Sequence, residues 1–352
     1  MTRIAAVEVV TPPHRYPQAQ ITDEFARTCL PRNASQTLLR RLHESSKVDT
    51  RHLVLPLDEY ARLHDFTEAN DVFLDAAVDL GSAALTGALE QAGLSPVEVD
   101  FIMSSTVTGI AVPSLDARIA ARVGLRPDVK RIPLMGLGCM AGAAGIARLH
   151  DVLAGTPGAV GALVCVELCS LTVQRDDPSI ANLVASGLFG DGAGAVVACG
   201  SQHSSRTSNP RVVDSHSHLY PDTERAMGWD VGTSGLKVVL GAEIPDLVDT
   251  YLREDVREFL AGHHLKIENI NRWISHPGGP KIIGAIESAL GIDDDALSLT
   301  WRSLRTVGNM SSVSVLHVLQ TTMRERPGNV GDYGLLLAMG PGFSSELVLL
   351  QW

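Results

Sequence analysis

The sequence of 352 residues predicts an α/β protein built from two similar halves. Short apolar runs typical of buried strands alternate with longer stretches in which apolar residues recur at helical spacing. The order of elements also repeats. In each half a long helix is followed by a polar link and a strand, at residues 94–105 and again at 265–276. A Gly-Asp turn followed by a strand also occurs twice, at 190–197 and at 331–337. Such a repeat favours two α/β units packed together. We place them at residues 1–205 and 206–352, joined by the polar segment 201–210.

The elements of the first half are read from apolar spacing, caps and breakers. The long Ala- and Leu-rich helix ends at Gly93, a residue suited to a left-handed helix terminus. Pro113 and Ser114 open another helix, which ends at Gly124. The remaining expectations are strands at 4–10, 99–103, 160–166 and 193–198, and helices that start near residue 22 and lie at 38–42, 72–92, 146–152 and 177–188.

The second half is read in the same way. We expect strands at 212–219, 273–275, 335–339 and 346–350, a hairpin around 232–235, and helices at 245–260, 281–290 and 312–323.

Composition excludes several classes of function. The chain is 45% hydrophobic and 20% charged, which permits a large core, and its net charge of −11 argues against a nucleic-acid or anionic-membrane surface. The five cysteines are scattered, which indicates a reducing compartment and neither a disulfide framework nor a metal site. The N-terminus reads as a strand, not a signal peptide, and no stretch predicts a membrane span. We therefore expect a cytoplasmic protein.

The most informative stretch runs from Arg131 to Ile146. An apolar strand stops at Gly136 and Gly138, Cys139 follows, and small residues then continue at helical spacing. This strand-turn-helix junction presents the cysteine at a helix start, where backbone N–H groups favour a thiolate. Cys139 is therefore a candidate nucleophile.

Two other interpretations of this stretch stay open. Cysteine is among the most buried residue types, so Cys139 is also read as a packing residue. Gly136-x-Gly138-x-x-Ala141 also fits a dinucleotide fingerprint, with Glu167 near the place of the ribose-binding acid. That second interpretation predicts an NAD(P)-dependent dehydrogenase.

Two further polar residues stand where apolar elements end. His276 follows a strand and precedes Pro-Gly-Gly-Pro, and Asn309 lies in Gly-Asn-Met-Ser-Ser before a helix. Taken singly, they read as a loop histidine and a helix cap. Arg40, Arg41 and Arg51 are candidates for contact with an anionic ligand, with a solvated face as the alternative.

Cys139, His276 and Asn309 together resemble the Cys-His-Asn triad of thiolase-fold condensing enzymes, in particular the type III polyketide synthases, the chalcone-synthase-like family. The motifs that carry the resemblance occur in family order: Gly138-Cys-Met-Ala-Gly142, Leu188-Phe-Gly-Asp-Gly-Ala193, Ser275-His-Pro-Gly-Gly-Pro280, Gly308-Asn-Met-Ser-Ser312 and Gly340-Pro-Gly-Phe343. The resemblance implies a thiolase-like αβαβα fold, which also accounts for the repeat. The dinucleotide interpretation explains neither His276 nor Asn309.

The resemblance implies an acyltransferase. Cys139 would take an acyl group from a CoA thioester, because a thiolate is a suitable exchange partner for a thioester. His276 and Asn309 would stabilise the enolate that decarboxylation of malonyl-CoA leaves. The carbanion then attacks the acyl-Cys139 and extends the chain by two carbons, without metal, flavin or nicotinamide.

The resemblance also assigns residues to the cavity and to its entrance. Phe189 matches the family's gating aromatic, whereas Val238 stands where plant enzymes have a second phenylalanine. Val112 belongs to a loop that reaches across the dimer. The predicted substrate-contacting residues are Phe189, Cys169, Thr172, Val238, Ser311, Val107, Thr108 and Val112, and the predicted CoA-contacting residues are Arg40, Arg41 and Lys281.

The apolar wall and the segment Glu167-Leu-Cys-Ser-Leu-Thr172 resemble bacterial alkylpyrone and alkylresorcinol synthases. We therefore expect an aliphatic acyl-CoA starter, malonyl-CoA or alkylmalonyl-CoA extenders, a role in secondary metabolism and a homodimer. A ketoacyl synthase III-type enzyme that condenses once with an acyl carrier protein is the alternative within the thiolase fold. A non-enzymatic binding protein is the alternative if the triad residues lie apart.

Overall fold

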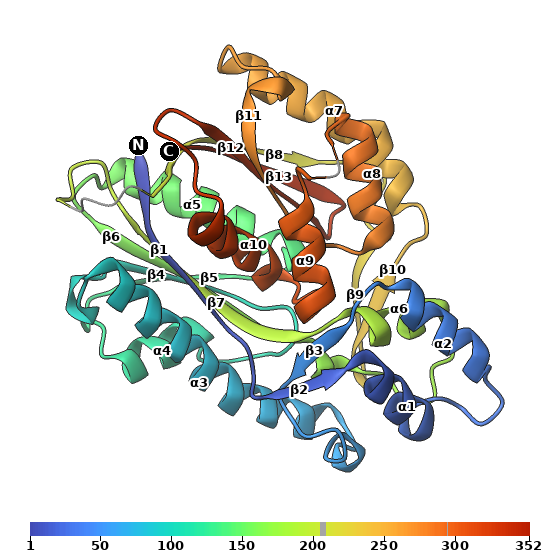
Figure 1. Ribbon diagram of the computed structural model, residues 1–352. Helices are drawn as coiled ribbons and strands as arrows, with labels where there is room; N and C mark the ends of the chain where they lie inside the picture. Colours follow the sequence, from blue (N-terminus) through green and yellow to red (C-terminus); the bar gives the residue numbers. More distant parts are fainter. Residues whose placement is uncertain (205–208, 294) are drawn as a thin grey trace.

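The chain folds into five layers, αβαβα, as seen in a computed structural model that describes residues 1–204, 209–293 and 295–352 (Figure 1). Nine strands form one large sheet in the order β11-β12-β13-β8-β1-β7-β6-β4-β5. Their bounds are β1 Thr2–Val10, β4 Phe101–Ser105, β5 Lys130–Leu134, β6 Val160–Leu168, β7 Asp191–Cys199, β8 Arg211–Leu219, β11 Ile270–Ser275, β12 Tyr333–Gly340 and β13 Ser344–Gln351. The predicted fold class is confirmed.

Two small two-stranded sheets and ten α-helices accompany the large sheet in the described residues. One small sheet pairs β2 (His14–Pro17) with β3 (Thr50–Leu53), and the other is a hairpin of β9 (Met227–Gly232) and β10 (Gly235–Leu240). The helices are α1 Gln18–Thr28, α2 Gln36–Ser45, α3 Phe66–Ala92, α4 Leu115–Val123, α5 Ala141–Gly155, α6 Ile180–Leu188, α7 Ile244–Gly262, α8 Pro280–Leu290, α9 Ser298–Val307 and α10 Ser312–Glu325. Short 3-10 turns lie at Tyr60–Arg62, Pro96–Glu98, Gly138–Met140, Cys169–Thr172 and Ile267–Asn269.

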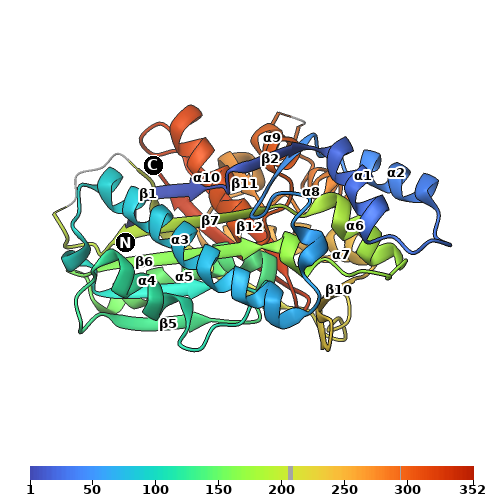
Figure 2. The same cartoon turned by 90° about the horizontal axis from the view of Figure 1, so that it is seen from below.

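Helices α5 and α10 lie side by side in the central layer and contact strands of both halves of the sheet (Figures 1 and 2). The core around them combines side chains from α5, α10 and strands on either side of the β1–β8 junction. Gly142 of α5 permits this approach, because a Cβ there would lie 2.3 Å from the backbone oxygen of Ser312 in α10. The small residues after Cys139 thus have a packing role between the two halves.

The outer layers cover the two remaining faces. Helices α3 and α4 bury one apolar core against the first half of the sheet, and α7, α8 and α9 bury another against the second half. Among the described residues, α3 is the one helix long and apolar enough to span a membrane, but its apolar side chains pack in the core beneath the sheet. It ends at Gly93 with φ of 67°, as the sequence predicts.

The strand order shows how the halves repeat. In the first half β1, β7, β6 and β4 follow one another, and in the second half β8, β13, β12 and β11 follow with the same pattern of antiparallel and parallel neighbours. The predicted match of β4 with β11 is confirmed. The predicted match of β7 with β12 is wrong, because β12 runs parallel to β11 as β6 runs parallel to β4, so β7 corresponds to β13.

Several boundaries differ from the sequence prediction. Helix α1 begins at Gln18, ahead of the expected start near residue 22, because Pro17 precedes it in an extended conformation. Helix α3 begins at Phe66, six residues before the expected start, since the Asp65 side chain caps the Glu68 N–H. The predicted junction between residues 205 and 206 lies outside the described residues.

Candidate active site

Three chain segments carry Cys139, His276 and Asn309 to one cavity of about 630 Å³. Cys139 lies in the 3-10 turn that leads into α5, His276 directly follows β11, and Asn309 lies between α9 and α10. All three side chains line the same space, so the convergence that the sequence motifs imply is present in the structure. The cavity is mainly apolar, as substrate pockets generally are.

The environment of Cys139 differs from the expectation of a preformed thiolate. Burial, together with the nearby charge of Glu167, raises the pKa of the Cys139 thiol to about 12, although a hydrogen bond with Ser311 opposes the rise. The start of α5 therefore does not by itself ionise the sulfur at neutral pH. Attack on a thioester needs a group that accepts the thiol proton.

His276 is the candidate acceptor of that proton, because it lines the same cavity as Cys139. Its side chain is 5% exposed, and burial lowers its pKa to about 3, so the imidazole is neutral at physiological pH. Neither ring nitrogen has a hydrogen-bond partner among the described residues. A buried polar group without a partner is unusual in native proteins and is typical of a site that binds a ligand. The backbone fixes the residue, since its N–H donates to the Leu337 oxygen at 2.9 Å.

Asn309 is oriented by its own loop. Its Oδ1 accepts a hydrogen bond from the Ser311 N–H at 2.8 Å, which turns the amide Nδ2 toward Gly278 beside the cavity. The one bond of Nδ2 in the structure is long, 3.4 Å to the Gly278 oxygen. Nδ2 thus keeps donor capacity for an oxygen that carries negative charge.

A backbone bridge joins Asn309 to Phe189. The Asn309 N–H donates to the Leu188 oxygen, and the Gly190 N–H donates to the Asn309 oxygen, both at 2.9 Å. Arg51 also donates to the Phe189 oxygen at 2.6 Å. Phe189, which the sequence predicts as a gate, is therefore attached to the loop that carries Asn309.

Glu167 lies beneath the site, fully buried at the end of β6. It accepts hydrogen bonds from the Ser312 hydroxyl at 2.6 Å, the Thr108 hydroxyl at 3.0 Å and the Val107 N–H at 3.1 Å. Burial raises its pKa to about 7 despite these bonds. The residue ties β6, the loop after β4 and α10 together beneath Cys139.

The predicted cavity residues divide into two groups. Val107, Cys169, Phe189, Val238 and Ser311 line the cavity with the triad. Thr108 and Thr172 line smaller adjoining spaces, because the Thr108 hydroxyl is held by Glu167 and the Thr172 hydroxyl by the Cys169 oxygen. Val112 is 88% exposed and does not line the cavity of its own chain.

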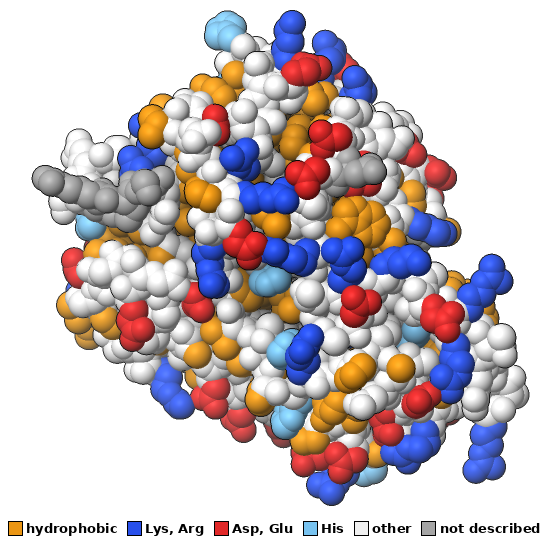
Figure 3. All heavy atoms as spheres, viewed as in Figure 1, with side chains coloured by type: hydrophobic (Ala, Val, Ile, Leu, Met, Phe, Trp, Pro, Cys, Tyr) orange, Lys and Arg blue, Asp and Glu red, His pale blue; other side chains and the backbone are white. Residues whose placement is uncertain are grey.

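The predicted CoA residues also divide. Lys281 lines the cavity together with Leu42, Ser45 and Ser46. Arg40 and Arg41 do not line it, and Arg40 pairs with Asp23 at 2.7 Å on the surface. Acidic and basic side chains are interspersed on the face shown in Figure 3.

Sequence reasoning missed Trp229 and Met339 as cavity residues. Trp229 lies in β9 of a two-stranded hairpin and Met339 in a buried strand. Neither residue lies in a polar motif, so nothing in the surrounding sequence indicated that either would line the cavity. In the described part of the chain, no group of three or more His, Cys, Asp or Glu side chains forms a candidate metal site.

Comparison with known proteins agrees with this geometry. The family "Chalcone and stilbene synthases, N-terminal domain" matches residues 1–202, and the corresponding C-terminal domain matches residues 211–352. The chain is 52% identical over its whole length to 1,3,6,8-tetrahydroxynaphthalene synthase of Streptomyces peucetius subsp. caesius, covering 93% of that protein. It is 36% identical to a putative chalcone synthase of Bacillus subtilis, over 88% of this chain and 87% of that one.

A solved structure shows the same architecture. The crystal structure of 1,3,6,8-tetrahydroxynaphthalene synthase from Streptomyces coelicolor, a bacterial type III polyketide synthase, superposes with a TM-score of 0.93 at 29% identity and covers 99% of both chains. Two family domains that span nearly the whole chain and relatives above 30% identity lead to one conclusion. The chain belongs to the chalcone and stilbene synthase family and is a type III polyketide synthase, an enzyme of the acyltransferase type.

Proposed function

We propose that this enzyme condenses malonyl-CoA units on Cys139 and releases a polyhydroxylated aromatic product of the tetrahydroxynaphthalene kind. The observation that carries the proposal is the convergence of Cys139, His276 and Asn309 on one apolar cavity. The name of the relative at 52% identity supports the class of product.

Loading begins with the thiol of Cys139. As the sulfur attacks the thioester carbonyl, neutral His276 takes the thiol proton, and CoA leaves with a proton as free thiol. The reaction starts from a protonated thiol and a neutral imidazole, as the pKa values of the two groups require at neutral pH.

Extension then uses the donors around the cavity. Malonyl-CoA loses CO2, and the electron pair of the broken C–C bond forms an enolate whose oxygen receives hydrogen bonds from Asn309 Nδ2 and from the His276 ring. The enolate carbon attacks the acyl-Cys139 carbonyl and expels the thiolate. The exclusion of water from an apolar cavity strengthens these hydrogen bonds.

The product follows from the balance of atoms. A naphthalene has ten carbons, which five malonyl units supply after each loses CO2. Release of five CoA thiols and one water leaves C10H8O4, which is tetrahydroxynaphthalene, with no change of oxidation state. We therefore propose that the enzyme needs no cofactor beyond its CoA thioester substrates.

A second candidate function uses the same condensation reaction with a different starter. The cavity wall is apolar and Val238 lines it where plant relatives carry an aromatic residue, which favours an aliphatic acyl-CoA starter and an alkylpyrone or alkylresorcinol product. The family assignment leaves the carrier-protein-dependent ketoacyl synthase and the nicotinamide-dependent dehydrogenase without support.

The deciding experiment supplies labelled malonyl-CoA alone, or together with fatty acyl-CoA of several lengths, and identifies products by mass. A naphthalene product from malonyl-CoA alone supports the first candidate, and products that carry the intact acyl chain support the second. Malonyl carrier protein in place of malonyl-CoA should give no product. Absence of CoA release in every arm would refute both candidates.

The assembly and the entrance of the site remain proposals. We propose a cytoplasmic homodimer in which Val112, exposed in one chain, meets the substrate of the other. We also propose that Lys281 contacts the CoA phosphates at the cavity mouth, with Arg40 and Arg41 farther out on α2.

A further inference from the structure

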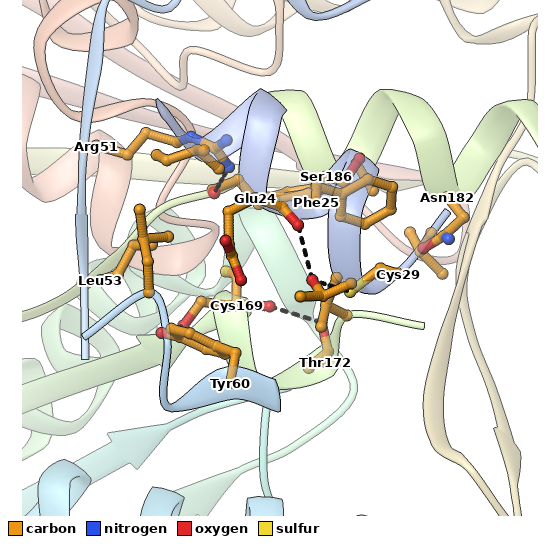
Figure 4. A pocket seen from close by; sticks show the side chains of 18 of the residues that line it. Glu24, Phe25, Cys29, Arg51, Leu53, Tyr60, Cys169, Thr172, Asn182 and Ser186 are labelled. Carbon is orange, nitrogen blue, oxygen red and sulfur yellow. Dashed lines mark hydrogen bonds between the residues drawn. The ribbon is translucent and has the colours of Figure 1, made fainter. Parts of the chain in front are cut away.

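A second, smaller space lies behind the wall of the reaction cavity. It has a volume of about 80 Å³, and we call it the rear chamber. Cys169, Phe189, Trp229 and Val238 line both spaces and thus form the partition between them. Figure 4 shows Phe25, Cys29, Arg51, Tyr60 and Cys169 around the rear chamber. The rear chamber therefore adjoins the reaction cavity across these four side chains.

The wall of the rear chamber is apolar except for a few polar side chains. Helix α1 contributes Ile21 and Phe25, Cys29 follows its end, and Leu53 and Leu57 also line the chamber. An apolar pocket with a small number of placed polar groups is typical of a specific ligand site. Its size is about that of two or three water molecules in the liquid, which is enough for the short end of a chain.

Arg51 is the unusual member of this wall. Its side chain is 3% exposed, and its hydrogen bonds go to neutral oxygens, from Nε to Gln18 Oε1 at 3.0 Å and from Nη1 to the Phe189 oxygen at 2.6 Å. Its Nη2 is buried without a hydrogen-bond partner among the described residues. Burial lowers the pKa of Arg51 to about 10, so the guanidinium stays charged at neutral pH. A buried charge without a directly bonded counter-ion is costly.

The carboxylates near Arg51 are engaged elsewhere. Asp191 attracts the guanidinium through space, but its oxygens accept hydrogen bonds from the Val54 N–H and from the Ser170 N–H and hydroxyl. Glu24 also lines the chamber, and its two oxygens are bound by Arg27. Among the described residues, no carboxylate therefore accepts a hydrogen bond from Nη2 of Arg51.

We propose that the rear chamber binds a carboxylate at the distal end of the acyl chain and that Arg51 is the residue that holds it. This inference rests on the proposed function, in which malonyl-CoA also serves as the starter. A malonyl group loaded on Cys139 with its carboxylate retained grows into a chain with an anionic end, and that end leaves later as CO2 from a β-keto acid. A fatty acyl chain has a methyl group in the same place. The chamber thus selects starters by the charge of their far end.

The test compares starters that differ only in that end. Succinyl-CoA is paired with butyryl-CoA and glutaryl-CoA with pentanoyl-CoA, since in each pair a carboxylate replaces a methyl group. The value of kcat/KM for extension by labelled malonyl-CoA is measured for each, and acylation of Cys139 is measured by intact mass. We expect the wild type to favour the anionic member about tenfold or more, the effect of a charge-assisted hydrogen bond.

Three variants separate binding from packing. Arg51→Met should bring the ratio within each pair close to one, and Cys29→Phe should do the same by filling the chamber without changing Arg51. Gln18→Leu removes a structural partner of Arg51 and keeps its charge, so this variant should retain the preference. Because the readout is a ratio within one enzyme, loss of folded protein does not alter it.

The outcomes distinguish this inference from the proposed function. Equal use of both members by the wild type, or an unchanged ratio in Arg51→Met, overturns the chamber assignment even if malonyl-CoA alone yields an aromatic product. A marked preference without a naphthalene product supports the chamber and contradicts the proposed product. If no starter is extended, the acylation ratio still decides the question.

Discussion

At the scale of single residues, hydrogen bonds fix the orientation of the Asn309 carboxamide and leave its nitrogen able to donate. Its oxygen is committed to the Ser311 N–H, and its nitrogen has one long bond. Asn309→Ala should slow decarboxylation of malonyl-CoA by about a hundredfold or more, because removal of one oxyanion donor has that effect in other enzymes. Release of labelled CO2 measures this step directly.

Acylation of Cys139 serves as the control for Asn309→Ala. The variant should still take an acyl group from a CoA thioester, since Asn309 is not required for thiol attack. An equal loss of acylation and decarboxylation would show that the substitution disturbs the whole site.

The second prediction at this scale concerns the activation of Cys139. Burial raises the pKa of its thiol, so without a base the sulfur should be unreactive. His276→Ala should reduce alkylation of Cys139 by iodoacetamide at pH 7 about tenfold or more, as measured by mass. Cys139→Ala identifies the background from the other four cysteines. A variant alkylated as fast as the wild type would show that the helix start alone ionises the sulfur.

Residue identities at the site were largely predictable from sequence, but their electrostatics were not. The motifs around Cys139, His276 and Asn309 predicted a shared site, and the structure brings them to one cavity. A helix start predicted a thiolate, yet the pKa depends on desolvation by residues distant in sequence. The orphaned nitrogen of Arg51 was equally inaccessible, because it depends on which groups from α1 and β7 fail to meet it.

At the scale of secondary-structure elements, the site depends on the approach of α5 to α10. Gly142→Ala would place a methyl group 2.3 Å from the Ser312 oxygen and 2.7 Å from a Val315 methyl. We expect a loss of about 1–3 kcal/mol in the free energy of unfolding, as for other overpacked cores, together with reduced activity. Urea denaturation and CoA release measure the two effects.

Gly155→Ala provides the matched control at the other end of α5. A Cβ there would meet nothing within 4 Å, so the variant should be as stable as the wild type or slightly more stable. If both variants lose the same stability, a cause other than the α5–α10 contact would be responsible.

Helices and strands were predicted well where the apolar pattern continues over many residues. They were predicted less well where a capping residue sets the boundary of a helix or where strand pairing sets the place of a strand in the sheet. Helix α3 was recognised from its apolar residues and Gly93, but its first turn depends on the Asp65 cap. The prediction that β7 and β12 are equivalent was wrong because it relied on the Gly-Asp turn that both strands share. The position of a strand in the sheet depends instead on the strands that pair with it.

At the scale of the whole molecule, buried histidines should link stability to pH. Burial lowers the pKa of His43 to about 3 and that of His317 to about 4, while an unfolded histidine titrates near 6.5. Between these values the unfolded chain binds more protons, so these histidines lower stability as the pH falls below 6.5. Glu167 and Asp191, with pKa raised to about 7 and about 6, oppose this trend.

A single variant isolates one histidine from the others. His317→Gln removes a group that binds a proton in the unfolded chain but not in the folded protein between pH 6.5 and pH 4. Relative to wild type, the free energy of unfolding of the variant should therefore rise by about 1.4 kcal/mol for each pH unit from pH 6.5 down toward pH 4. Urea denaturation at several pH values measures this difference. A difference that does not change with pH would mean that His317 titrates normally in the folded protein.

The bridge between Phe189 and Asn309 has a consequence for how such an enzyme diversifies. Because two main-chain hydrogen bonds join Asn309 to Leu188 and Gly190 on either side of Phe189, an insertion or deletion near either segment would shift Asn309 together with Phe189. New starter preferences should therefore arise by exchange of side chains on a conserved peptide path, and loop-length variation should be confined to segments remote from this crossing.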